Sequence, residues 1–491
     1  MLNNKVLFYS LLILILYSVG YYFFGERIQV ENGFGWDGTT YAAYAQNFWH
    51  ELQYTQDLYH INRTLPSFVI YYALNFFHLN AQSPRVIVNA FTILNSFCFI
   101  GAGYLWFKIA QFKKFDISVY AIGFMSLFIN YLYLKHNYYD PVLTDSTAVF
   151  LGMLSLSLYV RKQYFLLALS MIPAYFTWPI SIVLLCPLLL FTEPLEISSE
   201  INRTERYSNI FLMIIFIYIC IKLTYKMGNA QIVGNSIDIS YPLLPYSILI
   251  ASLFIYWVLL NSRVLVTFKQ ILKINYKTAI YFLFAFSICT TLYQWLESQI
   301  INFASVKMYF TIFDLFTISV LGAIARPGLF IVAHLAFWGP ALVLIALLLK
   351  NILKESLHES YGMMLFVVAT AFLALNSQTR QLDFNFPFMV YLLCLTLRKI
   401  PISKTALFYY FSTGLVVSKV YYYINQTPLV GDILKFPYQR FMMNSGTYMC
   451  WRGYIINSGL LIIATIMVYL GFFNKAKIAK KVDSIEVGQL S

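Results

Sequence analysis

The sequence predicts an all-α membrane protein, a polytopic helical bundle of about 14 (12–14) transmembrane helices. Three observations support this class. Hydrophobic residues make up 60% of the 491-residue chain and charged residues only 11%, and the mean hydropathy is +0.67, whereas roughly a quarter of the residues in soluble domains are charged. Apolar runs of about twenty residues recur, long enough for a helix to cross a hydrocarbon core about 30 Å thick. Alternating segments of about ten residues, typical of barrel strands, do not occur.

The expected spans follow the apolar runs along the chain. The run after Lys5 is interpreted as an uncleaved first anchor, because further spans follow it and no small-x-small cleavage site is evident. The pair of runs that flank Trp178 is short and is expected to form a hairpin that need not cross fully. The expected spans are residues 6–24, 86–107, 116–134, 142–160, 163–177, 179–192, 207–226, 243–261, 278–296, 329–349, 360–376, 384–397, 405–424 and 453–473.

The positions of the cations predict the orientation, since short loops rich in Lys and Arg remain cytoplasmic. With the N-terminus inside, most of the 34 Lys and Arg residues fall in cytoplasmic loops, and both termini are cytoplasmic. The net charge of +13 is therefore interpreted as a topology signal, so membrane lipids are expected partners and nucleic acid is not. We expect a single transmembrane domain over residues 1–473 and a basic cytoplasmic tail over residues 474–491.

The three longest connections, residues 25–85, 297–328 and 425–452, all fall on the predicted outer side. Long loops on a polytopic scaffold commonly carry binding and chemistry, so the outer face is the predicted working face. The apolar stretch 65–74 is too short to cross and is expected to be a juxtamembrane helix, and the segment 306–325 is a second such helix.

Ionisable side chains at this face are the candidate site residues, and each has a structural alternative. Asp37, in Gly35-Trp36-Asp37-Gly38-Thr39-Thr40-Tyr41, is a candidate catalytic base or a simple turn former. Asp145 is costly inside a span and therefore a functional candidate, or else it caps its helix. The cationic candidates are Arg63 and Arg326, each otherwise a headgroup anchor, Arg380, otherwise paired with Asp383 at the surface, and Lys419, which otherwise snorkels to the interface.

Four segments in this order resemble the polytopic glycosyltransferases of the GT-C superfamily, which use polyprenyl-phosphate-linked sugars. They are Trp36-Asp37-Gly38-x-x-Tyr41 after the first span, Arg63-Thr64-Leu65-Pro66, Tyr139-Asp140-Pro141-x-x-x-Asp145 at the fourth span, and Gln378-Thr379-Arg380 followed by Pro387. The likeness extends over about three quarters of the chain as architecture. The sequence departs from the superfamily in one respect, because Asp37 has no adjacent acid where many members carry a pair.

The resemblance implies a GT-C-like fold and sugar transfer at the outer face to a lipid, glycan or protein acceptor. Asp37 is then the base that takes the proton of the acceptor hydroxyl. Asp140 is the second catalytic acid, which holds the acceptor, binds a divalent cation together with Asp37, or orients an arginine. The departing polyprenyl phosphate would be bound by cations, with Asp145 as a further substrate-binding residue. The cationic candidates for this role are Arg380, Arg326 and Arg63, in that order, and Lys419.

Two classes of function remain open from the sequence. The preferred one is a membrane glycosyltransferase, with a glycan polymerase as a related possibility. The other is a transporter or a flippase of lipid-linked oligosaccharides, which should show repeated halves and broken helices near the middle of the membrane. A divalent metal cation is left open, but the spacings of His50, His60, His78 and His136 fit no zinc motif. The expected location is a bacterial inner membrane, or alternatively the endoplasmic reticulum.

Overall fold

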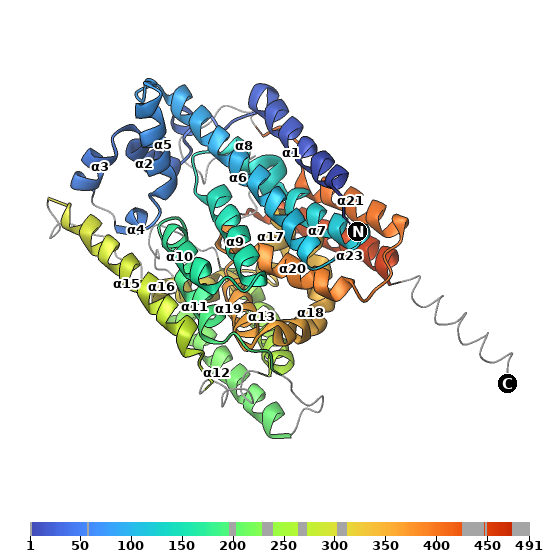
Figure 1. Ribbon diagram of the computed structural model, residues 1–491. Coiled ribbons are helices and arrows are strands. Elements are labelled where there is room, and N and C mark those ends of the chain that lie inside the picture. The colour runs from blue at the N-terminus through green and yellow to red at the C-terminus, as the bar shows by residue number, and fades with distance from the viewer. Residues whose placement is uncertain are drawn as a thin grey trace.

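The structure is a computed structural model that describes residues 2–55, 58–195, 203–227, 239–263, 273–301, 312–424, 446 and 449–473. All regular elements within these ranges are helices (Figure 1). Among them, six helices are long and apolar enough to cross a membrane, or up to eight if each of two bent pairs counts as one span. The chain is therefore a multi-pass helical membrane protein. The count of about 14 spans and the orientation of the termini remain predictions.

The first long connection folds into a group of short helices beside the start of the second long helix (Figure 1). The apolar stretch predicted as a juxtamembrane helix is helical and packs against α2 and α6. It has Pro66 in its first turn, where a missing backbone N–H costs nothing. The elements are α1 (Asn4–Phe24), η1 (Val30–Gly33), α2 (Gly38–Gln46), α3 (Phe48–Tyr54), α4 (Leu58–Ile61), α5 (Leu65–Phe76) and α6 (Pro84–Phe112).

The next expected span is bent by 49° between residues 128 and 132. Asn130 lies in this break, and its side-chain amide donates to the carbonyls of Ser126 and Leu127 at 2.9 and 3.0 Å. Its side-chain oxygen accepts the backbone N–H of Tyr133 at 3.0 Å. One side chain thus replaces helical hydrogen bonds lost on both sides of the bend. The elements here are α7 (Ile117–Phe128), the π-helical turn η2 (Leu132–His136), α8 (Asn137–Tyr139) and α9 (Asp145–Val160).

The pair of short runs around Trp178 forms two short helices, as expected. They have 12 and 10 residues, or about 18 and 15 Å at 1.5 Å per residue, which is less than the thickness of the hydrocarbon core. The α-helices described after them are longer, with 25, 19 and 23 residues. In order, these elements are α10 (Tyr164–Tyr175), α11 (Ser181–Leu190), α12 (Arg203–Met227), η3 (Tyr241–Leu243), α13 (Leu244–Ser262) and α15 (Tyr276–Ser298).

Two spans expected in the last third differ from the structure. The expected span 329–349 is broken at Gly339, whose φ of +66° and ψ of −151° are accessible almost only to glycine, and Pro340 begins the next helix. The expected span 405–424 ends as a helix at Ser418. The elements are α16 (Ile312–Ile324), α17 (Leu329–Trp338), α18 (Pro340–Glu359), α19 (Tyr361–Leu373), η6 (Thr379–Leu382), α20 (Phe386–Leu397), α21 (Lys404–Ser418) and α23 (Trp451–Phe472). The segment 306–325 was expected to form a second juxtamembrane helix. It is helical as α16, from residue 312, and residues 306–311 lie outside the described residues.

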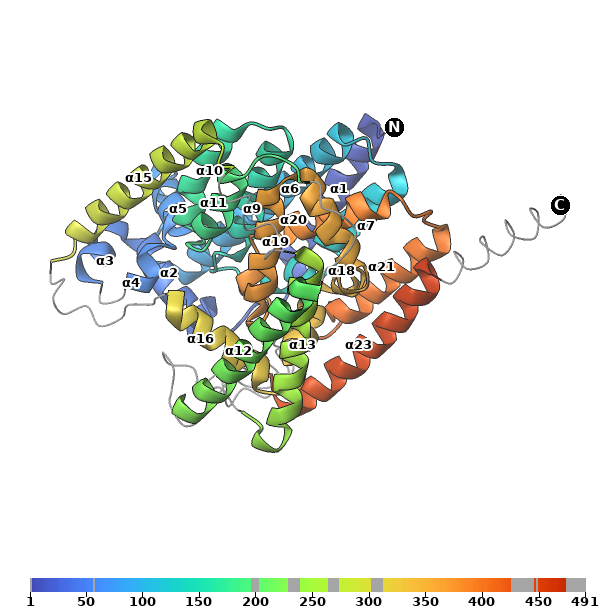
Figure 2. The ribbon, with the colours of Figure 1, turned by 90° about the horizontal axis from the view of Figure 1, so that it is seen from below.

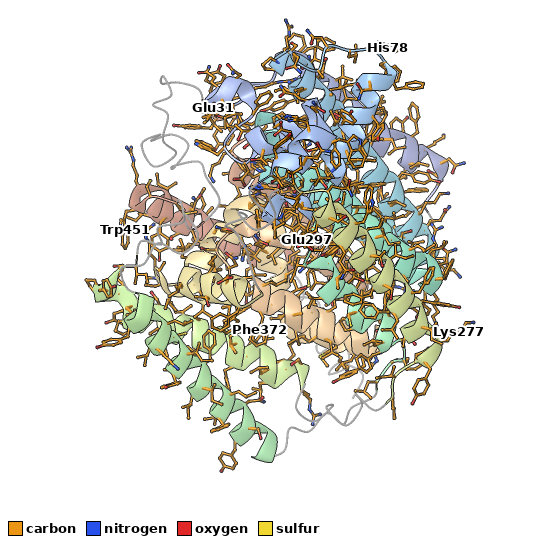
Figure 3. The ribbon with its side chains drawn as sticks, turned by 90° about the vertical axis from the view of Figure 1, so that its left-hand side faces the viewer. Glu31, His78, Lys277, Glu297, Phe372 and Trp451 are labelled. Carbon is orange, nitrogen blue, oxygen red and sulfur yellow. The ribbon has the colours of Figure 1, made fainter. Side chains whose placement is uncertain are left out.

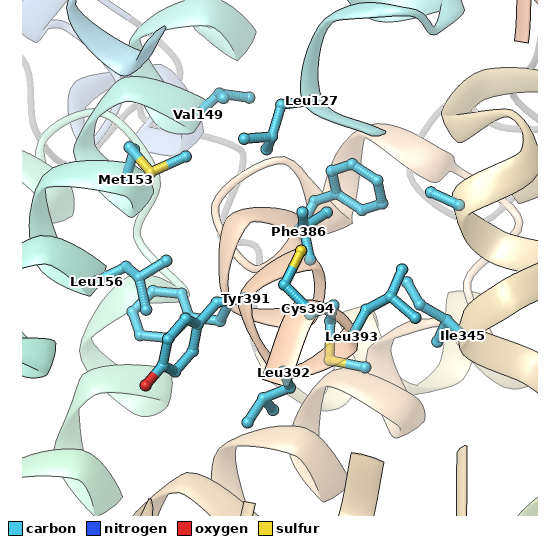
Figure 4. Packing of buried hydrophobic residues seen from close by; sticks show 14 of the residues in the cluster. Leu127, Val149, Met153, Leu156, Ile345, Phe386, Tyr391, Leu392, Leu393 and Cys394 are labelled. Carbon is cyan, nitrogen blue, oxygen red and sulfur yellow. The ribbon is translucent and has the colours of Figure 1, made fainter. Parts of the chain in front are cut away.

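The core is built around α20, which is buried along its whole length. It packs against α7, α9 and α18, while α21 and α23 run side by side at the edge of the bundle (Figure 2). Because every face of α20 meets another helix, its position fixes the segment that precedes it, residues 379–385. Figure 4 shows Tyr391, Leu393 and Cys394 of α20 among Leu127 of α7, Met153 and Leu156 of α9 and Ile345 of α18.

Connections predicted to lie on the same side of the membrane contact one another. On the predicted outer side, the backbone N–H of Ile301 donates to Gln53 at 3.0 Å, Leu65 donates to Phe176 at 3.0 Å and Gly446 donates to Ser377 at 2.7 Å. On the predicted inner side, Tyr361 donates to Glu193 at 2.9 Å and Asn275 to Leu190 at 3.0 Å, and Lys113 pairs with Glu359 at 2.9 Å. In Figure 3, Glu31 and His78 lie at the top of the view and Lys277 at the lower right. The loops thus sort into two sets, as the predicted topology requires.

Candidate functional site

Asp37 lies in a loop that two glycines allow to rest on the segment after α8. A Cβ atom at Gly35, whose φ is +74°, would lie 2.8 Å from Oδ1 of Asp140, and one at Gly38 would lie 2.9 Å from the carbonyl oxygen of Val142. Asp37 is the residue before α2, yet its side chain makes no capping hydrogen bond. Its carboxylate, 53% exposed, instead faces Arg380. Gly35 supplies the positive φ of this loop, and Asp37 lies in the turn that leads into α2, so its turn position and its contact with Arg380 hold together.

Arg380 joins two acids that are distant in sequence. Its Nε and Nη2 donate to the two carboxylate oxygens of Asp145 at 2.6 and 3.0 Å, a bidentate pair, and its Nη1 lies 3.5 Å from Oδ2 of Asp37. Asp145 is the first residue of α9, whose N-cap residue is Thr144, and both of its carboxylate oxygens accept hydrogen bonds from Arg380. The alternative that Arg380 pairs with Asp383 at the surface is wrong, because Asp145 is the partner and Asp383 is fully buried.

Asp140 is a buried acid beside this ion pair. Burial raises the pKa of Asp140 to about 8; the Arg380 guanidinium opposes this shift, and the carboxylates of Asp145 and Asp37 add to it. Its Oδ1 atom is buried, with no hydrogen-bond partner within the described part of the chain. The carboxyl group is therefore mostly protonated at pH 7.

Asp383, the residue after η6, is a second buried acid. Burial, with the neighbouring charge of Asp145, raises the pKa of Asp383 well above its usual range. Its backbone N–H donates to the carbonyl of Arg380 at 3.0 Å, so the two residues are held in one turn. Asp145 thus lies between the Arg380 guanidinium and the buried carboxyl group of Asp383.

Arg63 supplies a second buried cation near Asp37. It lies between α4 and α5 with its guanidinium carbon 4.3 Å from the ring centre of Tyr59 and 4.9 Å from that of Trp178. Only 8% of it is exposed, so the alternative of a headgroup anchor is wrong. The charges of Asp37 and Arg380 both act on it. Among the described residues it makes no ion pair with a carboxylate.

Arg326 and Lys419 have surroundings of their own. Nη1 of Arg326 donates to the carbonyl of Met449 at 2.6 Å, and its guanidinium lies 4.6 Å from the ring centre of Trp451. Lys419 follows the last turn of α21 in the left-handed conformation, with φ of +54°. They are 4% and 5% exposed, so the anchor and snorkelling alternatives are wrong. Neither is among the charged groups that act on Asp140, Asp145 or Arg380.

Two further side chains at the cluster were not chosen from the sequence. Nε2 of His136 lies 3.9 Å from Oδ1 of Asp145, with its ring between Tyr131 and Phe337. Tyr41 is buried close to Arg63 and Asp37. Helical spacing is the signal that could have found both, because His136 precedes Asp140 by one turn and Tyr41 follows Asp37 by one turn.

Within the described ranges, no three His, Cys, Asp or Glu side chains come together. Asp37 and Asp140 are the two acids that could hold a divalent cation whose other ligands come from a phosphate or from water, and Asp140 would first have to lose its proton.

Comparison of the chain with protein-family models, with curated proteins and with solved structures yields no match. Asp37, Asp140, Asp145 and Arg380 form one group of charged and titratable side chains, here called the acid–arginine cluster.

Proposed function

We propose that the protein is a membrane glycosyltransferase that moves a sugar from a polyprenyl-phosphate-linked donor to a lipid, glycan or protein acceptor. The observation that carries the proposal is the ion-pair chain from Asp37 through Arg380 to Asp145. It joins two acids and one arginine selected from separate parts of the sequence. Sugar transfer needs a base for the acceptor and a cation for the departing phosphate, and this cluster supplies the base while Arg63 beside it supplies a buried cation.

Asp37 is the base in this proposal. Its side chain is half exposed, so an acceptor hydroxyl can approach it, and the Arg380 guanidinium holds it in place. The hydroxyl oxygen attacks the anomeric carbon of the sugar as its proton passes to the Asp37 carboxylate. Arg380 acts as a positioning residue, because its Nε and Nη2 are already bonded to Asp145.

The donor phosphate is assigned to Arg63, which reverses the order expected from the sequence. A guanidinium already engaged by a carboxylate has fewer donors for a phosphate, and this applies to Arg380. Arg63 is held by aromatic rings, which fix its position without consuming its N–H donors. We expect Arg63→Gln to weaken binding of the donor, and the matched control is Arg85→Gln at an exposed position.

One observation favours the alternative of a transporter or flippase. Two candidate spans are bent, by 49° and 98°, and discontinuous helices are typical of transporters. Asp140 and Asp145 of the acid–arginine cluster follow the first of these bent pairs in the sequence. A transport function would use the same charged groups to bind a lipid phosphate without breaking a bond.

The test is transfer by the purified protein. A panel of radiolabelled undecaprenyl-phosphate sugars is incubated with the protein and a membrane lipid extract, with nucleotide sugars as a control donor. We expect labelled product from at least one lipid-linked donor and none from nucleotide sugars. If no donor is consumed, and proteoliposomes instead move a labelled lipid-linked oligosaccharide between leaflets, the flippase replaces the transferase.

A further inference from the structure

The carboxyl group of Asp140 lies against the backbone of Gly35 and forms no ion pair among the described residues. Both of its oxygens face the Cα atom of Gly35, so that a Cβ atom there would lie 2.8 and 3.0 Å from them. The residue is 9% exposed, and Oδ1 has no hydrogen-bond partner among the residues that the structure describes. An ionised carboxylate left in this position would lose most of its solvation without compensation.

The charges around Asp140 also favour its neutral form. The groups that face it are Arg380 of η6, Asp145 of α9, Asp37 before α2, and the tyrosines Tyr131 and Tyr139. Arg380 is the one cation among them, and its guanidinium is shared between Asp145 and Asp37. Asp140 therefore lies in a cluster whose positive charge is already balanced.

We propose that Asp140 is the acid of the reaction: its neutral carboxyl group donates a hydrogen bond to the departing phosphate and transfers its proton to it. This inference rests on the proposed transferase function and adds a role for one residue within it. The cluster then contains two acids with opposite roles. The exposed Asp37 accepts a proton as the base, and the buried Asp140 donates one.

The step balances without a further reactant. The acceptor oxygen forms a bond to the anomeric carbon, and its proton goes to the Asp37 carboxylate. The bond from the anomeric carbon to the phosphate oxygen breaks, with its electron pair remaining on that oxygen, which takes the proton of Asp140. The products are the glycosylated acceptor and the polyprenyl phosphate monoanion. The proton on Asp37 returns to Asp140, directly or through water, and both residues regain their first state.

Binding of undecaprenyl phosphate tests this role without any need to know the sugar or the acceptor. Asp140→Asn keeps a neutral hydrogen-bond donor, whereas Asp140→Ala removes it. We expect Asp140→Ala to raise the Kd about 10-fold and Asp140→Asn to change it less than about 3-fold. Both are measured by microscale thermophoresis in detergent at pH 7, with Glu31→Gln as an exposed control on the same loop.

The pH profile supplies a readout that a structural role would not alter. Above its pKa, Asp140 becomes an anion that accepts hydrogen bonds and repels phosphate. The wild-type Kd should therefore rise about 10-fold between pH 7 and pH 9.5, while Asp140→Asn shows only the titration of the lipid phosphate itself. Sugar transfer by Asp140→Asn should fall at least about 100-fold despite intact binding, because the amide cannot give up a proton.

The outcomes separate this inference from the function on which it rests. If wild type transfers sugar but Asp140→Asn binds undecaprenyl phosphate as weakly as Asp140→Ala, the acid role is overturned and the transferase stands. The same conclusion follows if binding requires Mg²⁺ or Mn²⁺ and EDTA abolishes it. If wild type neither binds undecaprenyl phosphate nor transfers from any donor of the panel, the function itself is contradicted and the acid role with it.

Discussion

The cluster depends on Arg380, because its guanidinium is bonded to the carboxylate of Asp145, whose side chain is only 3% exposed. A buried carboxylate without its partner is strongly destabilising. We expect Arg380→Gln to cost about 3–5 kcal/mol of stability for this reason. Adding Asp145→Asn in the same chain should recover part of the loss, because the unpaired charge is then removed.

The measurement is the midpoint of unfolding of the detergent-solubilised protein, followed by intrinsic fluorescence. Arg85→Gln, which changes an exposed arginine near the start of α6, serves as the control and should leave the midpoint unchanged. An Arg380→Gln variant as stable as this control would show that Asp145 does not depend on the ion pair.

Asp140 makes stability depend on pH in a direction opposite to that of most carboxyl groups. Its pKa is raised on folding from 3.8 to about 8, so the folded state binds more protons than the unfolded state between these values. Stability should therefore fall as the pH rises through this window. We expect Asp140→Asn to unfold at a higher temperature than wild type at pH 9 and at a similar temperature at pH 4. A constant difference at all pH values would contradict the raised pKa.

The sequence singled out Asp37, Asp140, Asp145 and Arg380 as candidates through its resemblance to a known superfamily and the predicted side of its loops, and these residues lie together in the structure. It could not predict their pairing. Arg380 has Asp383 three residues away, and only the packing of α20 against α9 brings Asp145, 235 positions earlier, closer than this neighbour. For the same reason the sequence ranked Arg63 last among the arginines, since Trp178 reaches it only in the folded chain.

At the scale of helices, one glycine sets how closely α9 and α20 approach. A Cβ atom at Gly152 would lie 2.2 Å from the carbonyl oxygen of Phe384, a backbone atom that cannot move aside alone. Phe384 is in the segment between Arg380 and α20. The close contact thus holds Asp145 at the start of α9 within reach of Arg380.

We expect Gly152→Ala to cost about 1–3 kcal/mol through overpacking and to weaken transfer, because it moves Asp145 away from Arg380. Gly459→Ala is the matched control, since no atom lies within 4 Å of its Cβ position inside α23. That change should raise stability by about 0.5–1 kcal/mol, the usual gain of alanine over glycine in a helix. Thermal unfolding and the transfer assay measure both effects. Equal stability of the two variants would contradict the close approach of the helices.

The helices themselves were largely predictable, because apolar runs without interior breaks favour helix in a membrane. The breaks were harder to predict. Gly339-Pro340 is a strong turn signal, but it stands inside a long apolar run. This run predicted one continuous span, whereas the helix breaks at Gly339. The bend at Asn130 depends on side-chain hydrogen bonds that no pattern of hydrophobicity records.

At the scale of the molecule, the two sets of connecting segments define two ends. One end carries the acid–arginine cluster, and the other carries ion pairs of Lys113 with Glu359 and Lys399 with Glu355. Alternation of loops along the sequence predicted these two sets, because each crossing reverses the side. Which end faces outward is a prediction from the distribution of cations.

Cysteine accessibility tests this orientation. We expect a cysteine introduced at position 37 to react with an impermeant maleimide in intact cells, and one at position 399 to react only after lysis, since their side chains are 53% and 65% exposed. Both cysteines are introduced into a protein that carries Cys450→Ser, because this change removes a partly exposed native thiol that the maleimide would also label. The reverse pattern of labelling would place the cluster in the cytoplasm and contradict the topology.

The most direct test of the central claim is sugar transfer by Asp37→Asn, compared with Glu31→Gln from the same loop. Both variants remove one carboxylate, but only Asp37 touches Arg380. We predict that Asp37→Asn remains folded, still binds undecaprenyl phosphate, and transfers at least about 100-fold more slowly from the active donor, while Glu31→Gln transfers like wild type. Transfer by folded Asp37→Asn at the wild-type rate would contradict the account.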